Sequence, residues 1–256
     1  MGIGTVVRAA WYKMTKKRPS TAAVILAGGS GSRMGDGAVS KQRMLLLGKT
    51  VLAHSILAFE ECDLVDEIVI VSKKEEIQKV KEDLEGLPIR KLRRIVSGGP
   101  TRQQSARHGL EAISKGMKYI AIHDAARCLV TPEMIRNVIR EAYQHGAACA
   151  GTPVTDTIKK VRPSGYVERS VDRTEYWAAQ TPQVFRETLY RSAAYSAKKY
   201  VWQATDDAML VEKIGHRVMM VDCGFENRKI TYPVDIQIAE QILRHRAAEK
   251  EGEGTQ

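Results

Sequence analysis

The 256-residue chain is 43% hydrophobic and 27% charged, which is typical of a soluble globular protein, and its length favours one domain over two equal ones. No run of about 18 apolar residues is present, so we expect no membrane-spanning helix and no membrane partner. Half of the net charge of +10 lies in residues 1–20, and the modest remainder suits an enzyme acting on anionic substrates better than a protein that binds nucleic acid.

Two terminal segments are predicted to lie outside the folded domain. Residues 1–20 form a basic extension that lacks the apolar stretch of a signal peptide, and we expect them to be poorly ordered. An extra helix or a loose contact with an anion are the alternative interpretations. Residues 247–256 form a charged tail that we expect to fray. A single domain is therefore predicted over residues 21–246.

The first predicted element is a strand at residues 22–26, a run of small and apolar residues that suits burial on both faces. It leads into Ala27-Gly28-Gly29-Ser30-Gly31-Ser32, where side chains are almost absent and backbone N–H groups can approach a ligand. Two cations, Arg33 and Lys41, follow on either side of a flexible glycine turn. This arrangement indicates a phosphate-binding site.

The spacing of this loop fits neither of two common nucleotide-binding motifs. Met34 stands where the dinucleotide motif G-x-G-x-x-G requires its third glycine, which disfavours a dehydrogenase. Arg43 stands where a P-loop ending in Gly48-Lys49-Thr50 requires its first glycine. The pattern that remains, L-A-G-G-x-G-x-R-M followed by K-Q, resembles sugar-nucleotide and alcohol-phosphate nucleotidyltransferases. A glycine-rich turn with two solvated cations is the alternative interpretation.

Helices and strands are predicted to alternate through the next hundred residues. The apolar spacing indicates helices at 51–59, 77–87, 106–113 and 134–142, and strands at 68–71, 92–96, 119–122 and 147–150. This alternation predicts an α/β fold with a Rossmann-like, mostly parallel sheet and helices on both faces. Such sheets bind ligands at the carboxyl ends of their strands, where three motifs fall: Ala27–Arg33, Gly98–Ser105 and His123–Arg127.

Residues 151–181 interrupt the alternation. β-branched and charged residues alternate there around Pro163-Ser164-Gly165, which indicates a hairpin. Few apolar positions lie on either face, so we expect this segment to stay outside the central sheet. A solvated hairpin and a projecting arm that pairs with another subunit are both open interpretations.

The remaining elements complete the domain. Helices are predicted at 187–199 and 206–214, and strands at 218–221 and 228–231. Pro233 is expected to open a last helix whose buried face holds Ile236, Ala239, Ile242 and Leu243.

The four cysteines argue against two kinds of site. No C-x-x-C pair is present among Cys62, Cys128, Cys149 and Cys223. This spacing disfavours a disulfide framework and a metal knuckle, and it favours a reducing, cytoplasmic location.

Nine motifs in order resemble the 2-C-methyl-D-erythritol 4-phosphate cytidylyltransferase family. They are LAGGSGSRM, SKQ, SGGPTRQQS, HDAAR, PVTDTIK, SVDR, QTPQVF, TDDA and NRKIT, and they cover residues 21–243. The resemblance implies a homodimeric, Mg²⁺-dependent enzyme that joins a sugar-alcohol phosphate to CTP and releases pyrophosphate. It also implies that the 151–181 arm reaches across the dimer.

The resemblance further implies a role for each matching residue. Arg33 and Lys41 would stabilise the transition state at the α-phosphorus, and Arg173 and Lys229 would hold the incoming phosphate in line. The nucleotide would contact Ala27, Gly28, Gly29, Gly31, Arg33, Lys41, Gly99, Ser105, Asp124 and Ala125. The acceptor would contact Asp156, Thr157, Arg173, Thr205 and Lys229.

Asp124 is the residue expected to hold Mg²⁺. A strand-end aspartate that only caps the following backbone is the alternative for it. His123 is interpreted as structural.

Departures from the family pattern concern the base contacts more than the reaction. Leu26-Ala27-Gly28-Gly29 stands where many relatives have P-A-A-G. Ser40 and Cys128 each stand where the family usually has Pro, and Pro100 stands where it often has Asp. Pro100 offers neither an N–H nor a polar side chain. A ribitol 5-phosphate cytidylyltransferase is the closest alternative function, because it shares the nucleotide-binding half, and a basic nucleic-acid-binding module is a more distant one.

Overall fold

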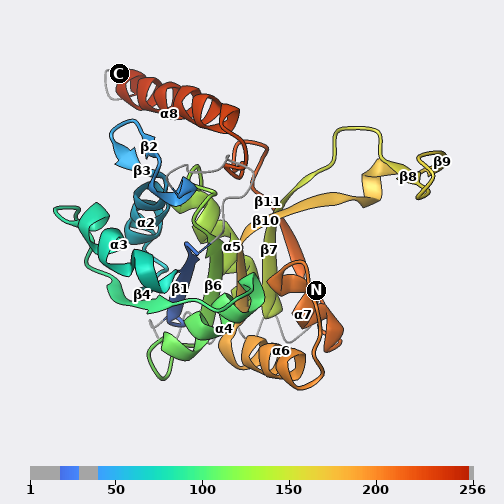
Figure 1. The fold of residues 1–256 in the computed structure, drawn as a ribbon, viewed down its shortest axis with the longest axis horizontal. Coiled ribbons are helices and arrows are strands. Elements are labelled where there is room, and N and C mark those ends of the chain that lie inside the picture. Colours follow the sequence, from blue (N-terminus) through green and yellow to red (C-terminus); the bar gives the residue numbers. More distant parts are fainter. Residues whose placement is uncertain (1–17, 29–39, 254–256) are drawn as a thin grey trace.

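A seven-stranded sheet forms the centre of the computed structural model, which describes residues 18–28 and 40–253 (Figure 1). Its strands lie in the order β11-β7-β10-β6-β1-β4-β5. Their bounds are β1 Thr21–Leu26, β4 Glu67–Ser72, β5 Leu92–Ser97, β6 Tyr119–Asp124, β7 Ala147–Pro153, β10 Trp177–Arg186 and β11 Met219–Asp222.

The sheet is mostly parallel, as predicted. β1 pairs in parallel with β4 and β6, β4 with β5, and β11 with β7. Strand β10 alone runs in the opposite direction, between β6 and β7. The α/β fold class expected from the sequence is therefore confirmed.

Helices cover both faces of the sheet. Their bounds are α2 Val51–Glu61, α3 Ile77–Leu84, α4 Arg102–Ala112, α5 Pro132–His145, α6 Glu187–Lys199, α7 Asp207–Lys213 and α8 Val234–Glu253, with short 3-10 turns η2 Lys41–Arg43, η3 Lys74–Glu76 and η4 Arg173–Glu175.

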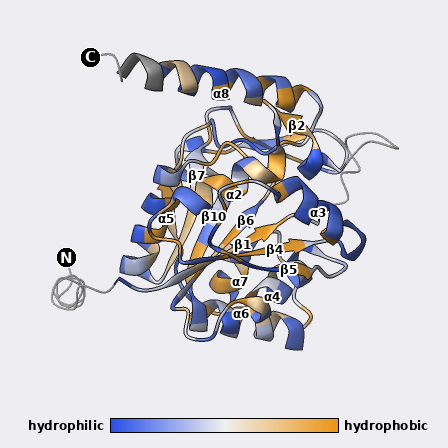
Figure 2. Ribbon diagram, turned by 90° about the vertical axis from the view of Figure 1, so that its left-hand side faces the viewer, coloured by the Kyte–Doolittle hydropathy of each residue, from blue (hydrophilic) through white to orange (hydrophobic). Residues whose placement is uncertain are grey.

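Alternating side chains of the strands build two separate apolar layers. In β1, Ala23 and Ile25 pack with α2, α3 and α5, whereas Ala22 and Val24 pack with α4, α6 and α7. Figure 2 shows the apolar strands enclosed between these two layers of helices. Each strand residue points to the face opposite its neighbour, so an unbroken apolar run satisfies both layers.

The ends of α4 and α5 follow from local sequence. Thr101 caps α4 in a reciprocal pair with Gln104, and Thr131 caps α5, which Pro132 opens. In the middle of α4, a Cβ added to Gly109 would lie 2.2 Å from Cγ1 of Val24. Glycine therefore lets α4 approach β1 closely, which brings the start of α4 toward the end of β1.

A third apolar cluster lies at one end of the sheet. The hairpin of β2 (Leu45–Leu46) and β3 (Lys49–Thr50) shares this cluster with α8 through Leu46 and Ala239, and Ile230 of the loop before α8 joins it. The predicted buried face of α8 is confirmed, because Ile236, Ile242 and Leu243 pack against this cluster.

The predicted hairpin forms from β8 (Lys159–Val161) and β9 (Val167–Ser170), which pair with each other and with no other described strand (Figure 1). Gly165 takes a φ of 87° in its turn, a conformation that favours glycine.

Three expectations for the second half of the chain were wrong. Residues 177–181 belong to the central sheet, because β10 begins at Trp177 and pairs with β7. Residues 228–231 form no strand, although Ile230 N donates to the carbonyl of Ala126 at 2.7 Å. Helix α8 continues to Glu253, so much of the predicted frayed tail is helical.

None of the described helices combines the length and apolar character needed to cross a membrane.

Candidate functional site

The candidate site lies where β1, β4 and β6 end at the carboxyl edge of the sheet. Leu26 of β1 is in register with Asp124 of β6. Ala27 N donates to the carbonyl of Val71 at 2.7 Å, and Ala125 N donates to the carbonyl of Leu26 at 3.0 Å. Four residues predicted to contact the nucleotide, Ala27, Gly28, Asp124 and Ala125, therefore follow directly from two adjacent strands.

The carboxylate of Asp124 is held between two cations. Arg102 Nε donates to Oδ1 at 2.9 Å, and Lys229 Nζ donates to Oδ2 at 2.6 Å. Arg102 opens α4, and Lys229 lies 105 residues beyond Asp124 in the chain. Three distant segments thus meet at one carboxylate.

A second, fully buried carboxylate extends this chain of charges. Arg102 Nη1 donates to Oδ2 of Asp207 at 2.7 Å, and the Tyr190 hydroxyl donates to Oδ1 at 2.6 Å. The amide oxygen of Gln183 accepts from the backbone N–H groups of Asp207 and Ala208, which fixes the start of α7. Arg102 therefore bridges α7 and the end of β6.

These contacts set the charge of the site. Burial opposes ionisation of Asp124, but Arg102 and Lys229 outweigh burial and hold the pKa of its carboxyl well below the usual range. Burial alone would lower the pKa of Arg102, but Asp207 and Asp124 raise it. Asp124 is therefore a carboxylate, and Arg102 a cation, throughout the physiological pH range.

The loop that carries Lys229 is fastened to the sheet on both sides. Asn227 donates through Nδ2 to the amide oxygen of Gln180 and to the carbonyl of Thr181. Beyond Lys229, Ile230 N donates to the carbonyl of Ala126. The side chain of Lys229 is 36% exposed, and only one of its three N–H donors goes to Asp124. The ammonium can therefore also face an anion outside the protein.

The loop between β5 and α4 follows the sequence prediction of close backbone. Gly99 N donates to Oγ of Ser105 at 3.1 Å. A Cβ at Gly99 would lie 2.6 Å from Cβ of Gln104, so a side chain there requires the loop to shift. Gly99 and Ser105 are thus brought together one helical turn from Arg102.

Lys41 begins the 3-10 turn η2, which two contacts fix. Gln42 is buried, and Arg43 donates through Nε and Nη2 to the two carboxylate oxygens of Asp83 at 2.6 and 2.9 Å. A bidentate pair of this kind specifies orientation as well as proximity. The backbone of Lys41 is thereby tied to α3.

The predicted acceptor residues do not all lie at this edge of one chain. Thr205 immediately precedes Asp206, the N-cap residue of α7, and is two residues before Asp207, which pairs with Arg102. Asp156, Thr157 and Arg173 instead belong to the projecting arm, where Arg173 donates to the carbonyl of Thr155. Gly29, Gly31 and Arg33 lie outside the described residues.

Several residues of the site carried no role in the sequence analysis. Arg102, Asp207 and Asn227 each lie inside a motif that was recognised, but only the motif order was used there. Arg127 is another, since its guanidinium donates to the carbonyls of Asn227 and Ala179 and joins the Lys229 loop to β10. Their signal in the sequence was a charged or amide side chain inside one of the nine motifs.

His123 lies beneath the site and is fully buried. Its Nδ1 contacts the Thr181 hydroxyl at 3.0 Å, and its ring packs against Phe59. Burial lowers its pKa to about 3, so the imidazole is neutral at physiological pH. These features suit the structural role expected for it.

Asp124 provides the oxygen donors that a magnesium ion prefers. No group of three or more potential ligand side chains occurs within the described residues. Mg²⁺ in nucleotide enzymes is commonly held by one or two carboxylates together with substrate phosphates, so one ionised carboxylate suffices. Two of its four lone-pair positions are taken by Arg102 and Lys229, which leaves room for a metal contact. The donor set therefore fits the ion.

A mostly parallel sheet with small loops and converging cations at its carboxyl edge is typical of nucleotide-binding α/β proteins. Comparison with known proteins specifies the class further. Residues 21–245 match the model of the family 2-C-methyl-D-erythritol 4-phosphate cytidylyltransferase. This chain belongs to that family.

Relatives and solved structures agree with this assignment. The chain is 40% identical to the enzyme of that name from Caldanaerobacter subterraneus, over 88% of this chain and 99% of the relative, and 39% identical to that from Thermosynechococcus vestitus, over 89% and 97%. The structure is similar to 4-diphosphocytidyl-2C-methyl-D-erythritol synthase from Anaerococcus prevotii, with a TM-score of 0.79, 27% identity and coverage of 88% of this chain and 99% of that one.

We predict that Asp207→Asn lowers the free energy of unfolding by about 3 kcal/mol, because it removes one charge from a buried, hydrogen-bonded ion pair. The measurement is equilibrium denaturation in urea. Glu212→Gln is the matched control, since Glu212 is exposed on the same helix and should change stability by less than about 0.5 kcal/mol. Equal free energies of unfolding for the two variants would contradict a stabilising role of the Asp207–Arg102 ion pair.

Proposed function

We propose that this chain transfers the cytidylyl group of CTP to 2-C-methyl-D-erythritol 4-phosphate, giving the CDP-alcohol and pyrophosphate. The observation that carries the proposal is the Lys229–Asp124–Arg102 contact at the strand edge of a chain whose residues 21–245 match this family. The relatives found carry the methylerythritol name, which favours this acceptor over ribitol 5-phosphate.

The chemistry needs positive charge more than it needs a base. A phosphate monoester has its second pKa near 6, so the attacking oxygen is already ionised at pH 7. Its approach to a triphosphate is opposed by about 4 kcal/mol for each pair of unit charges at 4 Å, with an effective dielectric near 20. Neutral, buried His123 has no proton to remove in such a step. The chain must instead supply cations where charge accumulates.

Each group then has a defined task. The bare backbone at Ala27, Gly28 and Gly99 admits the nucleotide, and Arg33 and Lys41 stabilise the charge at the α-phosphorus. Lys229 holds the acceptor phosphate in line, while Asp124 keeps the lysine ammonium oriented. Mg²⁺, when bound, neutralises charge on the triphosphate, with Asp124 as its protein ligand.

We further propose that the arm of residues 154–176 acts across a homodimer. Among the strands that the structure describes, β8 and β9 pair with no other strand, and Val161, Tyr166 and Val167 are exposed by 51, 78 and 58%. Apolar side chains gathered on a projecting hairpin favour a covered surface in the assembled protein. Asp156, Thr157 and Arg173 would then contact the acceptor in the neighbouring subunit's site.

The acceptor is tested by measuring pyrophosphate release from CTP and Mg²⁺. We expect turnover with 2-C-methyl-D-erythritol 4-phosphate and much slower release with ribitol 5-phosphate at equal concentration. Preference for ribitol 5-phosphate would overturn the acceptor while leaving cytidylyl transfer intact.

Removal of a single site cation should slow the reaction strongly. We expect Lys41→Ala and Lys229→Ala each to lower kcat by about 10²–10³-fold, the usual loss for one transition-state donor. Lys79→Ala on the exposed side of α3 is the control and should leave kcat unchanged. Activity of both site variants within a few-fold of wild type would remove these lysines from the catalytic role.

Mixed dimers test the arm. When Lys41→Ala and Arg173→Ala chains are coexpressed in equal amounts, half of the dimers are mixed, and an arm acting in trans restores one of their two sites. Activity should therefore recover to about a quarter of the wild-type value, far above either parent. Activity no higher than that of the parents would mean that each site is built within one chain.

A further inference from the structure

The side chain of Arg246 in α8 contacts two loops that lie far from it in the sequence. Its Nε and Nη2 donate to Oε2 of Glu226 at 3.1 and 2.8 Å, and its Nη1 donates to the carbonyl of Leu129 at 2.8 Å. The arginine side chain is only 20% exposed, so these bonds are largely shielded from water. One guanidinium on a helix therefore fastens both loops.

The first of these loops carries Lys229. Glu226 stands three residues before the lysine, and Arg228 N donates to the carbonyl of Glu226 at 2.6 Å in the turn between them. Because this turn is short and hydrogen-bonded, fixing Glu226 restricts the backbone from which Lys229 extends. Arg246 thus acts on the lysine through the loop that carries it.

The second loop follows Asp124 at the end of β6. Arg127 N donates to the carbonyl of Asp124 at 2.9 Å, and Val130 N donates to the carbonyl of Arg127 at 3.2 Å. These two turns connect Leu129 to the strand end. Arg246 therefore holds both the loop of the cation and the loop of the carboxylate that meet in the Lys229–Asp124 contact.

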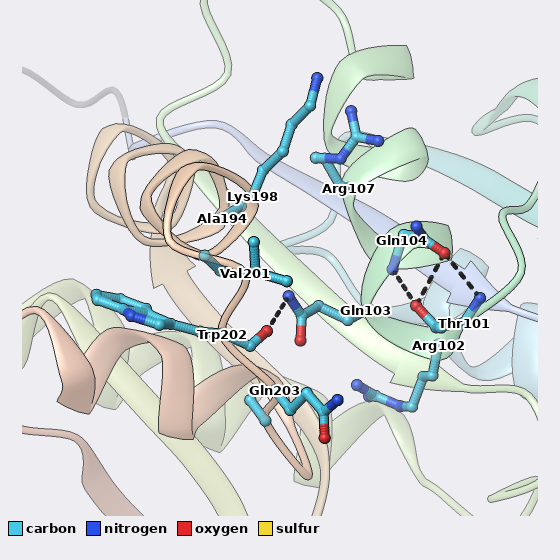
Figure 3. A pocket seen from close by; sticks show the side chains of 12 residues that line it. Thr101, Arg102, Gln103, Gln104, Arg107, Ala194, Lys198, Val201, Trp202 and Gln203 are labelled. Carbon is cyan, nitrogen blue, oxygen red and sulfur yellow. Dashed lines mark hydrogen bonds between the residues drawn. The ribbon is translucent and has the colours of Figure 1, made fainter.

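The other cation at Asp124 is braced in a comparable way. Arg102 opens α4, and its neighbour Gln103 donates through Nε2 to the carbonyl of Trp202 at 3.1 Å, in the segment after α6 (Figure 3). Each cation of the site is thus supported by a hydrogen bond between a residue outside the site and a segment remote in sequence.

We propose that Arg246 is a positioning residue of the reaction, which fixes the Lys229 loop against the segment after Asp124 and so sets where the lysine ammonium meets the acceptor phosphate. This inference rests on the function proposed above for Lys229. Arg246 lies one residue beyond the segment 21–245 that matches the family model, so the family assignment gives it no role.

The kinetic test compares Arg246→Met with Arg244→Met, at an exposed position of the same helix. A misplacement of about 1 Å can cost about 100-fold in rate, and a loosened loop should cost less. At saturating CTP and Mg²⁺ we expect Arg246→Met to lower kcat/KM for the acceptor about tenfold, with the calorimetric Kd for CTP changed less than about twofold. Arg244→Met should match wild type. An unchanged kcat/KM in Arg246→Met, or an equal loss of CTP affinity, would overturn the proposal.

Further variants separate the two bonds of the guanidinium. Glu226→Gln keeps an oxygen acceptor and leaves the Leu129 bond intact, so its loss of kcat/KM should be smaller than that of Arg246→Met. The double variant should equal Arg246→Met alone, since residues of one network are not additive. Arg246→Lys retains a charged donor and should recover part of the loss. Additive losses, or no recovery with lysine, would contradict a role through these contacts.

Amide hydrogen exchange tests the inference without turnover. The N–H of Ile230 donates to the carbonyl of Ala126, so its exchange reports whether the Lys229 loop stays attached. The N–H of Val24, at the centre of β1, reports the stability of the whole domain.

In Arg246→Met, we expect exchange at Ile230 to accelerate about tenfold more than exchange at Val24. Gln103→Leu removes the corresponding bond on the Arg102 side and should show no such preference for Ile230. Equal acceleration at both amides in Arg246→Met would mean a general loss of stability and would overturn the positioning role. Since exchange requires no substrate, failure of this inference is distinguishable from failure of the proposed reaction.

Discussion

The carboxylate of Asp124 between Arg102 and Lys229 is the contact on which the arrangement of this molecule depends. Each oxygen accepts from one cation, and the aspartate is only 9% exposed. A charge taken out of water at this depth is tolerated only where partners and hydrogen bonds compensate for it. The start of α4, the end of β6 and the loop before α8 are therefore required to meet at one point.

The same contact explains how the fold serves a reaction between two anions. Asp207 and Tyr190 hold the far side of Arg102, so the guanidinium is fixed before any substrate arrives. Lys229 is oriented by Asp124 yet remains partly exposed. Cations placed in advance need little reorganisation when charge develops, which is the usual source of electrostatic catalysis.

The sequence predicted the parts of the fold that have a strong local pattern. The alternating helices and strands, the arm hairpin and the buried face of α8 all follow from apolar spacing or turn residues. Strand β10 was missed because its buried Gln180, Thr181 and Gln183 are polar. They are satisfied by partners remote in sequence, such as Asn227, Asp124 and Asp207, and no local pattern reveals such contacts. The short strand expected at 228–231 does not form, because Ile230, the apolar residue of this stretch, packs in the cluster with α8 and not in the sheet.

The residues of the candidate site were likewise predictable only where the local sequence carries a signal. Asp124 and the small loops were identifiable at predicted strand ends, whereas the role of Arg102 depends on Asp207, which lies 105 residues away. A helix-opening arginine is usually solvated, and only the fold supplies the two carboxylates that hold it. The motif order carried the correct family because it reflects the whole edge of the sheet, including residues whose individual tasks were not apparent.

The most direct test of the central contact is an NMR pH titration of the Asp124 carboxyl carbon, in the wild-type chain and in Lys229→Met. The account predicts that the wild-type carboxyl remains ionised well below the ordinary aspartate pKa of about 3.9, and that its pKa rises in the variant. An ordinary pKa in the wild type, unchanged when the lysine is removed, would contradict it.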